Sequence, residues 1–151
     1  MPRHAPILTA ALLAALPMLS HAQAAQRPEV TAAAQALEQK VVAWRRDFHA
    51  NPELSLHEER TAAKVAEHLR ALGLQPVKLG GHGVVAIVQG GKPGPKIALR
   101  ADMDALPVTE KTGLPYASKA TTTFRGETVG VMHACGHDAH TGILMGVAEA
   151  L

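Results

Sequence analysis

The order of hydrophobic patterns along the 151 residues constrains the fold of this chain most strongly. Apolar residues recur at helical spacing from Glu29 to Asn51 and from Ser55 to Leu72, and a third helical pattern covers residues 138–151. Short apolar runs typical of strands lie between the last two patterns, at residues 75–79, 84–89 and 96–100. Two helices, then strands and a further helix, predict an α/β domain.

The first two predicted helices have recognisable ends. Asn51-Pro52 stops the first, because a residue before proline is disfavoured in the helical conformation. The second begins with a capping box from Ser55 to Glu58, and Gly73 can end it in the left-handed conformation. The residues predicted to face the core are Leu37, Val41, Trp44 and Phe48 in the first helix and Ala62, Val65, Leu69 and Leu72 in the second.

The second half of the chain is predicted to alternate between strands and loops. His82-Gly83 is a predicted turn, and residues 96–100 are predicted as a strand buried inside a sheet. Residues 107–128 contain several turn formers and are predicted to be irregular. The last helix reaches Leu151 without a capping residue, which predicts that the chain continues. The residues on its predicted buried side are Leu144, Val147, Ala148 and Leu151.

The first 24 residues have the composition of a secretory signal peptide. A short basic start precedes an apolar stretch from Ile7 to Leu19, and Ala22-Gln23-Ala24 supplies the small-x-small pattern that signal peptidase recognises. The stretch is shorter than the roughly 18–20 apolar residues of a spanning helix, which disfavours the alternative of a membrane anchor. We therefore expect residues 1–24 to be removed and residues 25–151 to be periplasmic or secreted, with no stable membrane anchor.

Composition narrows the function classes. The chain has 15 Lys and Arg against 13 Asp and Glu and only 3% aromatic residues, so it lacks the charge and the stacking surfaces of a nucleic-acid-binding protein. Its one cysteine, Cys135, has no partner in the chain, whereas exported domains usually pair cysteines in disulfides. A single thiol in an oxidising compartment needs burial or a ligand, and a bound metal ion would meet that need.

The segment Met132–His140 concentrates residue types that bind metals. It contains three of the nine histidines, the single cysteine and one carboxylate. Thiolate and imidazole are the ligands expected for zinc and similar metals, and Gly136 lets the backbone come close between Cys135 and His137. We therefore predict a metal site at Cys135 and His137.

Other interpretations of this segment stay open. His133 or His140 could supply a third local ligand, and Asp138 could orient an imidazole that binds the metal. Alternatively, the histidines are solvated loop residues and Cys135 is a small buried apolar residue.

A second candidate feature is the pair Asp102 and Asp104, which follows the predicted strand at residues 96–100. Ligand sites in α/β proteins lie beyond the C-terminal ends of such strands, so these carboxylates could bind a cation or orient one of its ligands. The alternative is an ordinary turn, in which Asp is common. We expect the Asp pair and the Met132–His140 segment to converge on one rim.

The remaining histidines give weaker signals. His49 and His57, on either side of Asn51-Pro52, are predicted as capping and surface residues, and His82 as a structural turn residue. No Gly-x-Ser-x-Gly elbow of the common serine hydrolases occurs in the sequence. Cys135 could act as a nucleophile, although its crowding by histidines on a tight turn favours a metal ligand.

Three ordered segments, residues 48–55, 97–107 and 130–141, resemble a family of metal-dependent amidohydrolases. They read Phe-His-Ala-Asn-Pro-Glu-Leu-Ser, Ile-Ala-Leu-Arg-Ala-Asp-Met-Asp-Ala-Leu-Pro and Gly-Val-Met-His-Ala-Cys-Gly-His-Asp-Ala-His-Thr. The family includes hippurate hydrolase, N-acyl-L-amino acid amidohydrolase and plant indoleacetyl-amino acid hydrolase, within the aminoacylase/carboxypeptidase group of di-metal peptidases. The resemblance covers the opening part of a full-length member.

The resemblance implies a fold and a reaction. Residues 25–151 would form the N-terminal part of a catalytic α/β domain, which has a mixed sheet with helices on both faces. A smaller inserted domain shapes the substrate pocket and assists dimerisation, so the full-length protein is expected to be a homodimer or another homo-oligomer. The implied cofactor is a pair of divalent ions, of zinc, manganese, cobalt or nickel. The implied substrates are N-acyl amino acids such as hippurate, which are cleaved to a carboxylic acid and an amino acid.

The resemblance also assigns roles to residues. It makes Cys135 and His137 metal ligands, and it assigns Asp104 to the catalytic centre as the aspartate that orients the site behind the metals. Asp102 stands where the wider group has a ligand histidine. The family's remaining ligands and its general-base glutamate lie downstream of Leu151, so this chain alone is expected to hold metal weakly and to be inactive.

Two other function classes stay open. The local ligands around Cys135 are compatible with a non-catalytic module that zinc stabilises. A cysteine hydrolase would instead use the thiol of Cys135 as its nucleophile.

Overall fold

The computed structural model describes residues 27–151, and the predicted signal peptide lies outside them. Over these residues, none of the helices has both the length and the hydropathy that a membrane span requires. The three predicted helices and the first two strands are confirmed, although both strands are shorter than predicted. In chain order the elements are α1 (Pro28–Ala50), α2 (Glu59–Ala71), β1 (Val77–Leu79), β2 (Gly83–Val85), β3 (Thr121–Phe124), β4 (Glu127–Gly130) and α3 (His137–Ala150).

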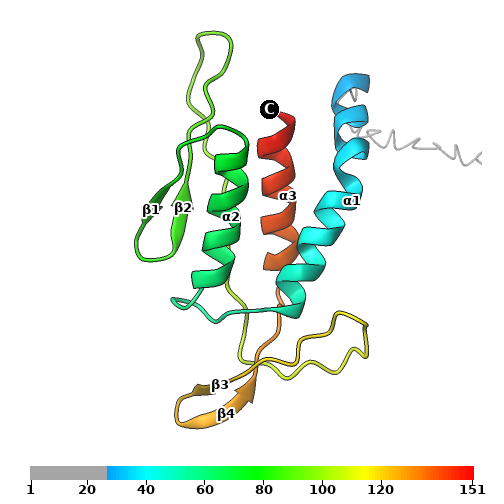
Figure 1. Ribbon diagram of the computed structural model, residues 1–151, viewed down its shortest axis with the longest axis vertical. Coiled ribbons are helices and arrows are strands. Elements are labelled where there is room, and N and C mark those ends of the chain that lie inside the picture. Colours follow the sequence, from blue (N-terminus) through cyan, green and yellow to red (C-terminus); the bar gives the residue numbers. More distant parts are fainter. Residues whose placement is uncertain (1–26) are drawn as a thin grey trace, which may run out of the picture.

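Helix α3 lies between α2 and α1 and runs antiparallel to α1 (Figure 1). Two buried glycines of α3 allow α1 to approach closely. A Cβ atom on Gly142 would lie 3.3 Å from the carbonyl oxygen of Val41, and one on Gly146 would lie 2.9 Å from Cγ2 of the same valine. The absence of side chains at these two positions therefore sets the distance between α1 and α3.

The core lies where the three helices meet, and it corrects one sequence prediction. Phe48 is 1% exposed, Ala62 is 1% exposed and Leu69 is 9% exposed, so these parts of the predicted helix faces are confirmed. The face predicted for α3 is wrong, because Leu151 is 79% exposed. Close packing against α1 selects the small residues of α3 instead. The buried residues of this helix are Asp138, Thr141, Gly142, Met145 and Gly146, and Leu144, Val147 and Ala148 are only half-buried.

Helix α2 is capped by Glu53 rather than by the predicted box at Ser55–Glu58. The carboxylate of Glu53 accepts hydrogen bonds from the backbone N–H groups of Arg60 (2.9 Å) and Thr61 (2.8 Å) and from the Thr61 hydroxyl (2.8 Å). The box prediction is wrong because the connection between the helices brings this more distant acceptor to the unpaired N–H groups of the first turn. At the other end, Gly73 has φ +80°, which confirms its left-handed conformation.

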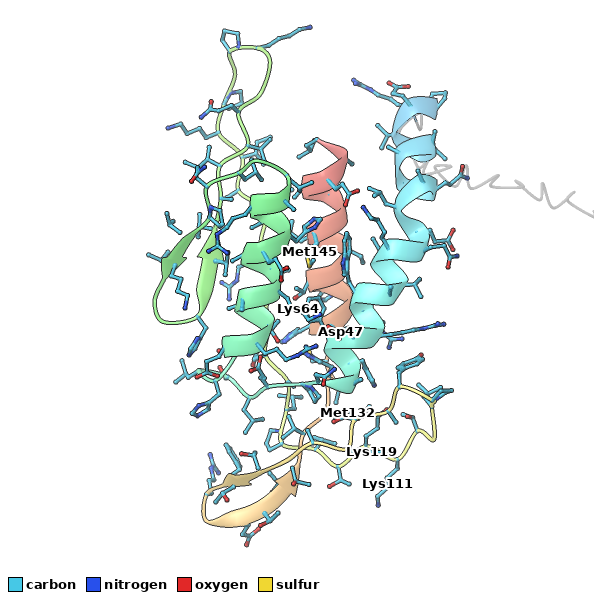
Figure 2. All side chains as sticks on the ribbon, viewed as in Figure 1. Asp47, Lys64, Lys111, Lys119, Met132 and Met145 are labelled. Carbon is cyan, nitrogen blue, oxygen red and sulfur yellow. The ribbon has the colours of Figure 1, made fainter. Side chains whose placement is uncertain are left out.

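An ion-pair cluster joins α1 to α2, where Asp47 lies beside Lys64 (Figure 2). Nη2 of Arg60 lies 2.7 and 2.9 Å from the two carboxylate oxygens of Asp47, and Nζ of Lys64 lies 3.1 Å from one of them. Burial alone would raise the pKa of Asp47, but the hydrogen bonds and positive charges of Arg60 and Lys64 outweigh it. The pKa is therefore held below its ordinary value of 3.8.

The strands form two separate antiparallel hairpins within the described residues, β1 with β2 and β3 with β4 (Figure 1). The second hairpin corrects the prediction that residues 107–128 are irregular. Its turn residues Arg125 and Gly126 have φ angles of 53° and 86°. Two successive positive φ angles are typical of the two-residue turns that match the twist of paired strands.

Residues 96–100 do not form the predicted buried strand. Ile97 is 83% exposed and Leu99 is 60% exposed, and the segment has no strand partner within residues 27–151. An apolar run becomes a buried strand only where neighbouring strands pair with it and other elements cover it. Within residues 27–151 the regular strands form only the two hairpins, and isolated bridges join Leu54 to Ala105 and Leu106 to Met132.

Candidate metal centre

Three segments that are far apart in the sequence meet near the N-terminal end of α3. The backbone N–H of Ala105 donates to the carbonyl oxygen of Glu53 at 2.7 Å. The next residue, Leu106, exchanges two backbone hydrogen bonds of 3.0 Å with Met132. This short ladder holds the Asp102–Asp104 segment between the other two, so the predicted convergence of the Asp pair and the Met132–His140 segment is confirmed.

The closest contact of this convergence joins Asp104 to His137. Nδ1 of His137 lies 2.8 Å from the backbone carbonyl oxygen of Asp104 and 3.0 Å from its carboxylate oxygen Oδ1. Both acceptors favour the form of the ring that carries a proton on Nδ1. Nε2 is then the nitrogen available to a cation, which is the usual arrangement of histidines that bind metals.

Cys135 precedes His137 by two residues and is exposed. Gly136, between them, has φ +79° and is the N-cap of α3. Its carbonyl oxygen accepts hydrogen bonds from the backbone N–H groups of Ala139 and His140, both at 3.1 Å. A side chain at this position would be strained, so the glycine allows the chain to turn sharply from the cysteine into the helix.

Asp102 is directed to a different partner from Asp104. Its Oδ1 atom lies 2.8 Å from Nε and 2.7 Å from Nη2 of Arg100, and its side chain is 45% exposed. The hydrogen bond from Arg100 lowers the pKa of Asp102 below its ordinary value. The backbone carbonyl oxygen of Asp102 accepts a 3.0 Å hydrogen bond from the Thr141 hydroxyl, which ties this segment to α3.

His133 is the most deeply buried histidine of the Met132–His140 segment, at 5% exposure. Neither ring nitrogen has a hydrogen-bond partner within the described residues. Burial lowers the pKa of His133 below its ordinary value of 6.5, since a charged ring would lose its hydration there. Its surroundings therefore favour the neutral imidazole, which is the form that binds metals.

His49 was predicted as a capping or surface residue, and this prediction is wrong. The side chain is 3% exposed and lies between two carboxylates. Nδ1 lies 2.8 Å from Oδ2 of Asp138, and Nε2 lies 3.0 Å from Oε1 of Glu110. Asp138 thus contacts the imidazole of His49 and not that of a predicted metal ligand. Only the motif Phe-His-Ala-Asn-Pro-Glu-Leu in the sequence pointed toward this residue.

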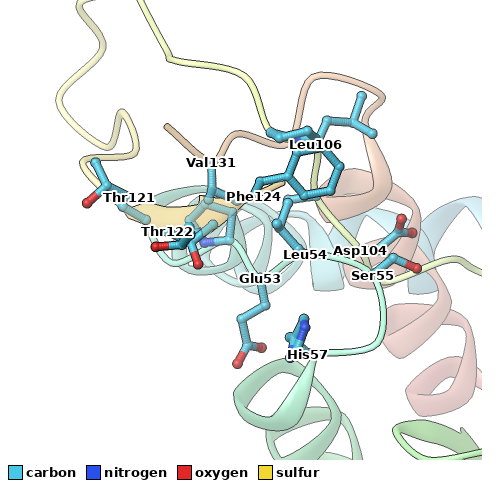
Figure 3. Close-up of a pocket in the computed structure, with 15 residues that line it drawn as sticks. Glu53, Leu54, Ser55, His57, Asp104, Leu106, Thr121, Thr122, Phe124 and Val131 are labelled. Carbon is cyan, nitrogen blue, oxygen red and sulfur yellow. The ribbon is translucent and has the colours of Figure 1, made fainter. Parts of the chain in front are cut away.

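A cavity of about 640 Å³ opens beside Asp104 (Figure 3). Its walls come from residues 52–55, His57, residues 104–107 and the β3 strand with Ala120, together with Val131. The wall combines apolar side chains with hydroxyl groups, represented by Leu54, Leu106, Phe124 and Val131 and by Ser55, Thr121, Thr122 and Thr123. Neither Cys135 nor His137 lines the cavity, so it lies next to the candidate metal centre and shares only Asp104 with it.

The donor groups present suit a divalent cation but do not complete a site. A thiol and an imidazole whose Nδ1 is already held by a carboxylate match the ligands of zinc and similar metals. Within residues 27–151, no three side chains of His, Cys, Asp or Glu are arranged to hold an ion together. Cys135 and His137 therefore fit as part of a metal site, and their role as ligands stays a prediction.

Comparison with known proteins shows which enzymes the chain is similar to. Residues 98–151 match peptidase family M20/M25/M40. A protein of Rhodococcus jostii (strain RHA1) named glutamate–cysteine ligase is 55% identical over 115 residues, which are 76% of this chain but only 13% of that protein. The N-acyl-L-amino acid amidohydrolase of Geobacillus stearothermophilus is 47% identical over 113 residues, which are 72% of this chain and 28% of the enzyme. The chain thus spans well under a third of the relatives that it matches.

A solved structure agrees with this assignment. The YXEP protein of Bacillus subtilis, described as a dinuclear metal binding peptidase from the M20 family, superimposes with a TM-score of 0.64 at 40% sequence identity. The superposition covers 74% of this chain and 30% of that protein, so the predicted fold class, part of a di-metal peptidase catalytic domain, is confirmed. Sequence and structure together show that this part of the chain is similar to members of peptidase family M20/M25/M40.

Proposed function

We propose that the complete protein uses divalent metal ions to hydrolyse the amide bond of N-acyl amino acids, with hippurate or N-acetyl amino acids as the substrate class. The observation that carries this proposal is the contact of Asp104 with Nδ1 of His137, which prepares Nε2 for a cation two residues from the thiol of Cys135. The amidohydrolase name of the Geobacillus relative supports the reaction, and the dinuclear metal binding peptidase of Bacillus supports the cofactor.

Cys135 and His137 would hold the metal in this proposal. When bound, a divalent ion polarises an amide carbonyl and lowers the pKa of a bound water molecule. Asp104 fixes the orientation of the His137 ring and the nitrogen that carries its proton, so that the lone pair of Nε2 is available without rearrangement. Further ligands, a second ion and a general base would have to come from residues other than those that meet here.

We also propose that the protein is exported and that the complete protein forms a homodimer. The basic start, the apolar stretch and the Ala22-Gln23-Ala24 pattern support cleavage after Ala24 and a periplasmic or secreted protein. N-terminal sequencing of the mature protein tests this, and an intact Met1 would contradict it. Sedimentation of the complete protein tests the proposed homodimer.

The function is tested by assaying the complete protein on hippurate before and after treatment with a chelator. We expect activity that the chelator abolishes and that added Zn²⁺, Mn²⁺, Co²⁺ or Ni²⁺ restores. Activity that is equal with and without chelator would contradict the proposal. Hydrolysis of other N-acyl amino acids but not of hippurate would support the proposed reaction and exclude the benzoyl group of hippurate from the acyl groups that the enzyme accepts.

Experiments on the complete protein also test the two alternatives, a zinc-stabilised module and a cysteine hydrolase. A zinc-stabilised module would bind zinc tightly and lose its helical circular-dichroism signal with the metal, without any amidase activity. A cysteine hydrolase would be inactivated by alkylation of Cys135 at a rate that bound metal does not change, because its thiolate would be free to react.

A further inference from the structure

The imidazole of His49 bridges two buried carboxylates that come from different parts of the chain. Asp138 belongs to the first turn of α3, and Glu110 belongs to the connection between β2 and β3. The side chain of His49 is 3% exposed, that of Asp138 is 1% exposed and that of Glu110 is fully buried. None of these three groups is a predicted metal ligand, so metal binding does not by itself explain why they are buried together.

The hydrogen-bond geometry fixes what the ring of His49 must be. Nδ1 lies 2.8 Å from Asp138 and Nε2 lies 3.0 Å from Glu110. An ionised carboxylate can only accept hydrogen bonds, so both ring nitrogens must donate, and only the doubly protonated imidazolium can do so. With both carboxylates ionised, the arrangement suits a ring that donates from both nitrogens.

The charges of the cluster balance only in that state. Nε of Arg45 donates to Oδ2 of Asp138 at 3.0 Å, the same oxygen that His49 contacts. Two cations then face two carboxylates, and removing either partner would leave a buried charge without compensation. Burial alone would raise the pKa of Glu110, but hydrogen bonds from Thr112, His49 and the backbone of Ser118 outweigh it and lower the pKa, which keeps this carboxylate ionised.

The surroundings of His49 include further polar groups on each element that packs against it. From the connection between β2 and β3, the Tyr116 ring meets the His49 ring edge to face at a centroid distance of 5.6 Å. The Tyr116 hydroxyl accepts a 3.1 Å hydrogen bond from Nη1 of Arg45.

The position of Asp138 links this cluster to the metal centre. Asp138 follows His137 directly, so whatever fixes its side chain also fixes the start of α3. Asp104 holds the His137 ring through Nδ1. We infer that His49 is a positioning residue. Its ring holds the carboxylate of Asp138 by a hydrogen bond and thereby fixes the position of His137 and of its Nε2 atom. This inference rests on the proposed function, since it assumes that His137 binds a metal.

The test is a Co²⁺ titration of the metal-free complete protein, followed through the thiolate-to-cobalt absorption band that Cys135 would produce. In His49→Gln, a single amide nitrogen replaces two ring nitrogens that contact different carboxylates, so at least one contact is lost. We expect the affinity for Co²⁺ to fall about tenfold, as for losses of groups that support a metal ligand. The band itself should persist. Glu110→Gln is a milder second variant with a smaller expected loss, and it is used if His49→Gln does not fold.

The matched control is Lys40→Met. Lys40 forms an ion pair with Glu149, which also joins α1 to α3 but at the far end of α3 from His137. A loss of general helix packing would lower the Co²⁺ affinity in both variants, whereas a positioning role affects His49→Gln alone.

The outcomes separate the two proposals. If the unsubstituted protein gives no thiolate-to-cobalt band, the metal site fails, and the inference about His49 fails with it. If the band is present and His49→Gln binds Co²⁺ as tightly as the unsubstituted protein and Lys40→Met, only the positioning role of His49 is overturned.

Discussion

The Nδ1 atom of His137 lies 2.8 Å from the carbonyl oxygen of Asp104 and 3.0 Å from its carboxylate, although 33 positions separate the two residues in the sequence. One residue thus supplies two acceptors to the same nitrogen. This double contact fixes both the ring orientation and the proton position of His137, and it is the structural basis of the proposed metal site.

The first prediction concerns Asp104. Asp104→Asn keeps an oxygen near Nδ1 of His137 but removes the negative charge, so we expect the metal affinity of the complete protein to fall about 10- to 100-fold. Equilibrium dialysis with Zn²⁺ measures this. Asp47→Asn is the control, because it makes the same chemical change in the ion-pair cluster between α1 and α2, and it should leave the zinc affinity unchanged. Equal affinities in the two variants would contradict the role of Asp104.

A second prediction follows from the cap of α2. Glu53→Ala leaves the N–H groups of Arg60 and Thr61 without their acceptor, and we expect the free energy of unfolding to drop by about 1–3 kcal/mol. Ser55→Ala should change it by less than about 0.5 kcal/mol, since the hydroxyl of Ser55 does not cap the helix in the structure. Urea unfolding monitored by circular dichroism compares the two. A larger loss of unfolding free energy in Ser55→Ala than in Glu53→Ala would instead support the capping box that the sequence predicts.

Much of this architecture follows from the sequence. The helical spacing of apolar residues predicted all three helices, and the Asp pair and the Met132–His140 segment were predicted to share one rim because both follow strand-like segments. The structure confirms the rim through the contact between Asp104 and His137. These features depend on local patterns and on backbone turns, which a single sequence displays directly.

Other features depend on contacts that no local pattern displays. His49 stands at the end of a helix, where a capping role is common, and only the tertiary packing of α1 against α3 buries it beside Asp138. Glu53 replaces the predicted cap for the same reason. The apolar run around Ile97 looked like a buried strand because of its composition, but a strand also needs partners, and the described residues supply none.

A third prediction concerns the approach of α1 to α3. Gly142→Val would place a branched side chain against the backbone of Val41 and Arg45, and we expect the free energy of unfolding to fall by about 1–3 kcal/mol. Gly94→Val is the control, because nothing lies within 4 Å of the added Cβ atom in that loop. Urea midpoints give the comparison. A Gly142→Val protein as stable as the control would show that α1 and α3 can separate freely.

A fourth prediction concerns acid stability. The pKa of Asp47 is lower in the folded protein than its ordinary value of 3.8, so the folded state is stabilised by this carboxylate at higher pH. That contribution is fully present above pH 3.8 and is lost as the pH falls below it through the folded-state pKa. Asp47→Asn should therefore be less stable than the unsubstituted protein at pH 6 and should lose less stability between pH 4 and pH 2. Parallel stability curves for the two proteins below pH 4 would contradict this.

The central claim is that the thiol of Cys135 and the imidazole of His137 bind the same metal ion. X-ray absorption spectroscopy at the zinc edge of the zinc-loaded complete protein tests it most directly. We predict a sulfur scatterer at about 2.3 Å together with imidazole scattering, and loss of the sulfur shell in Cys135→Ser. A spectrum with only nitrogen and oxygen neighbours, identical in the unsubstituted protein and in Cys135→Ser, would contradict the claim.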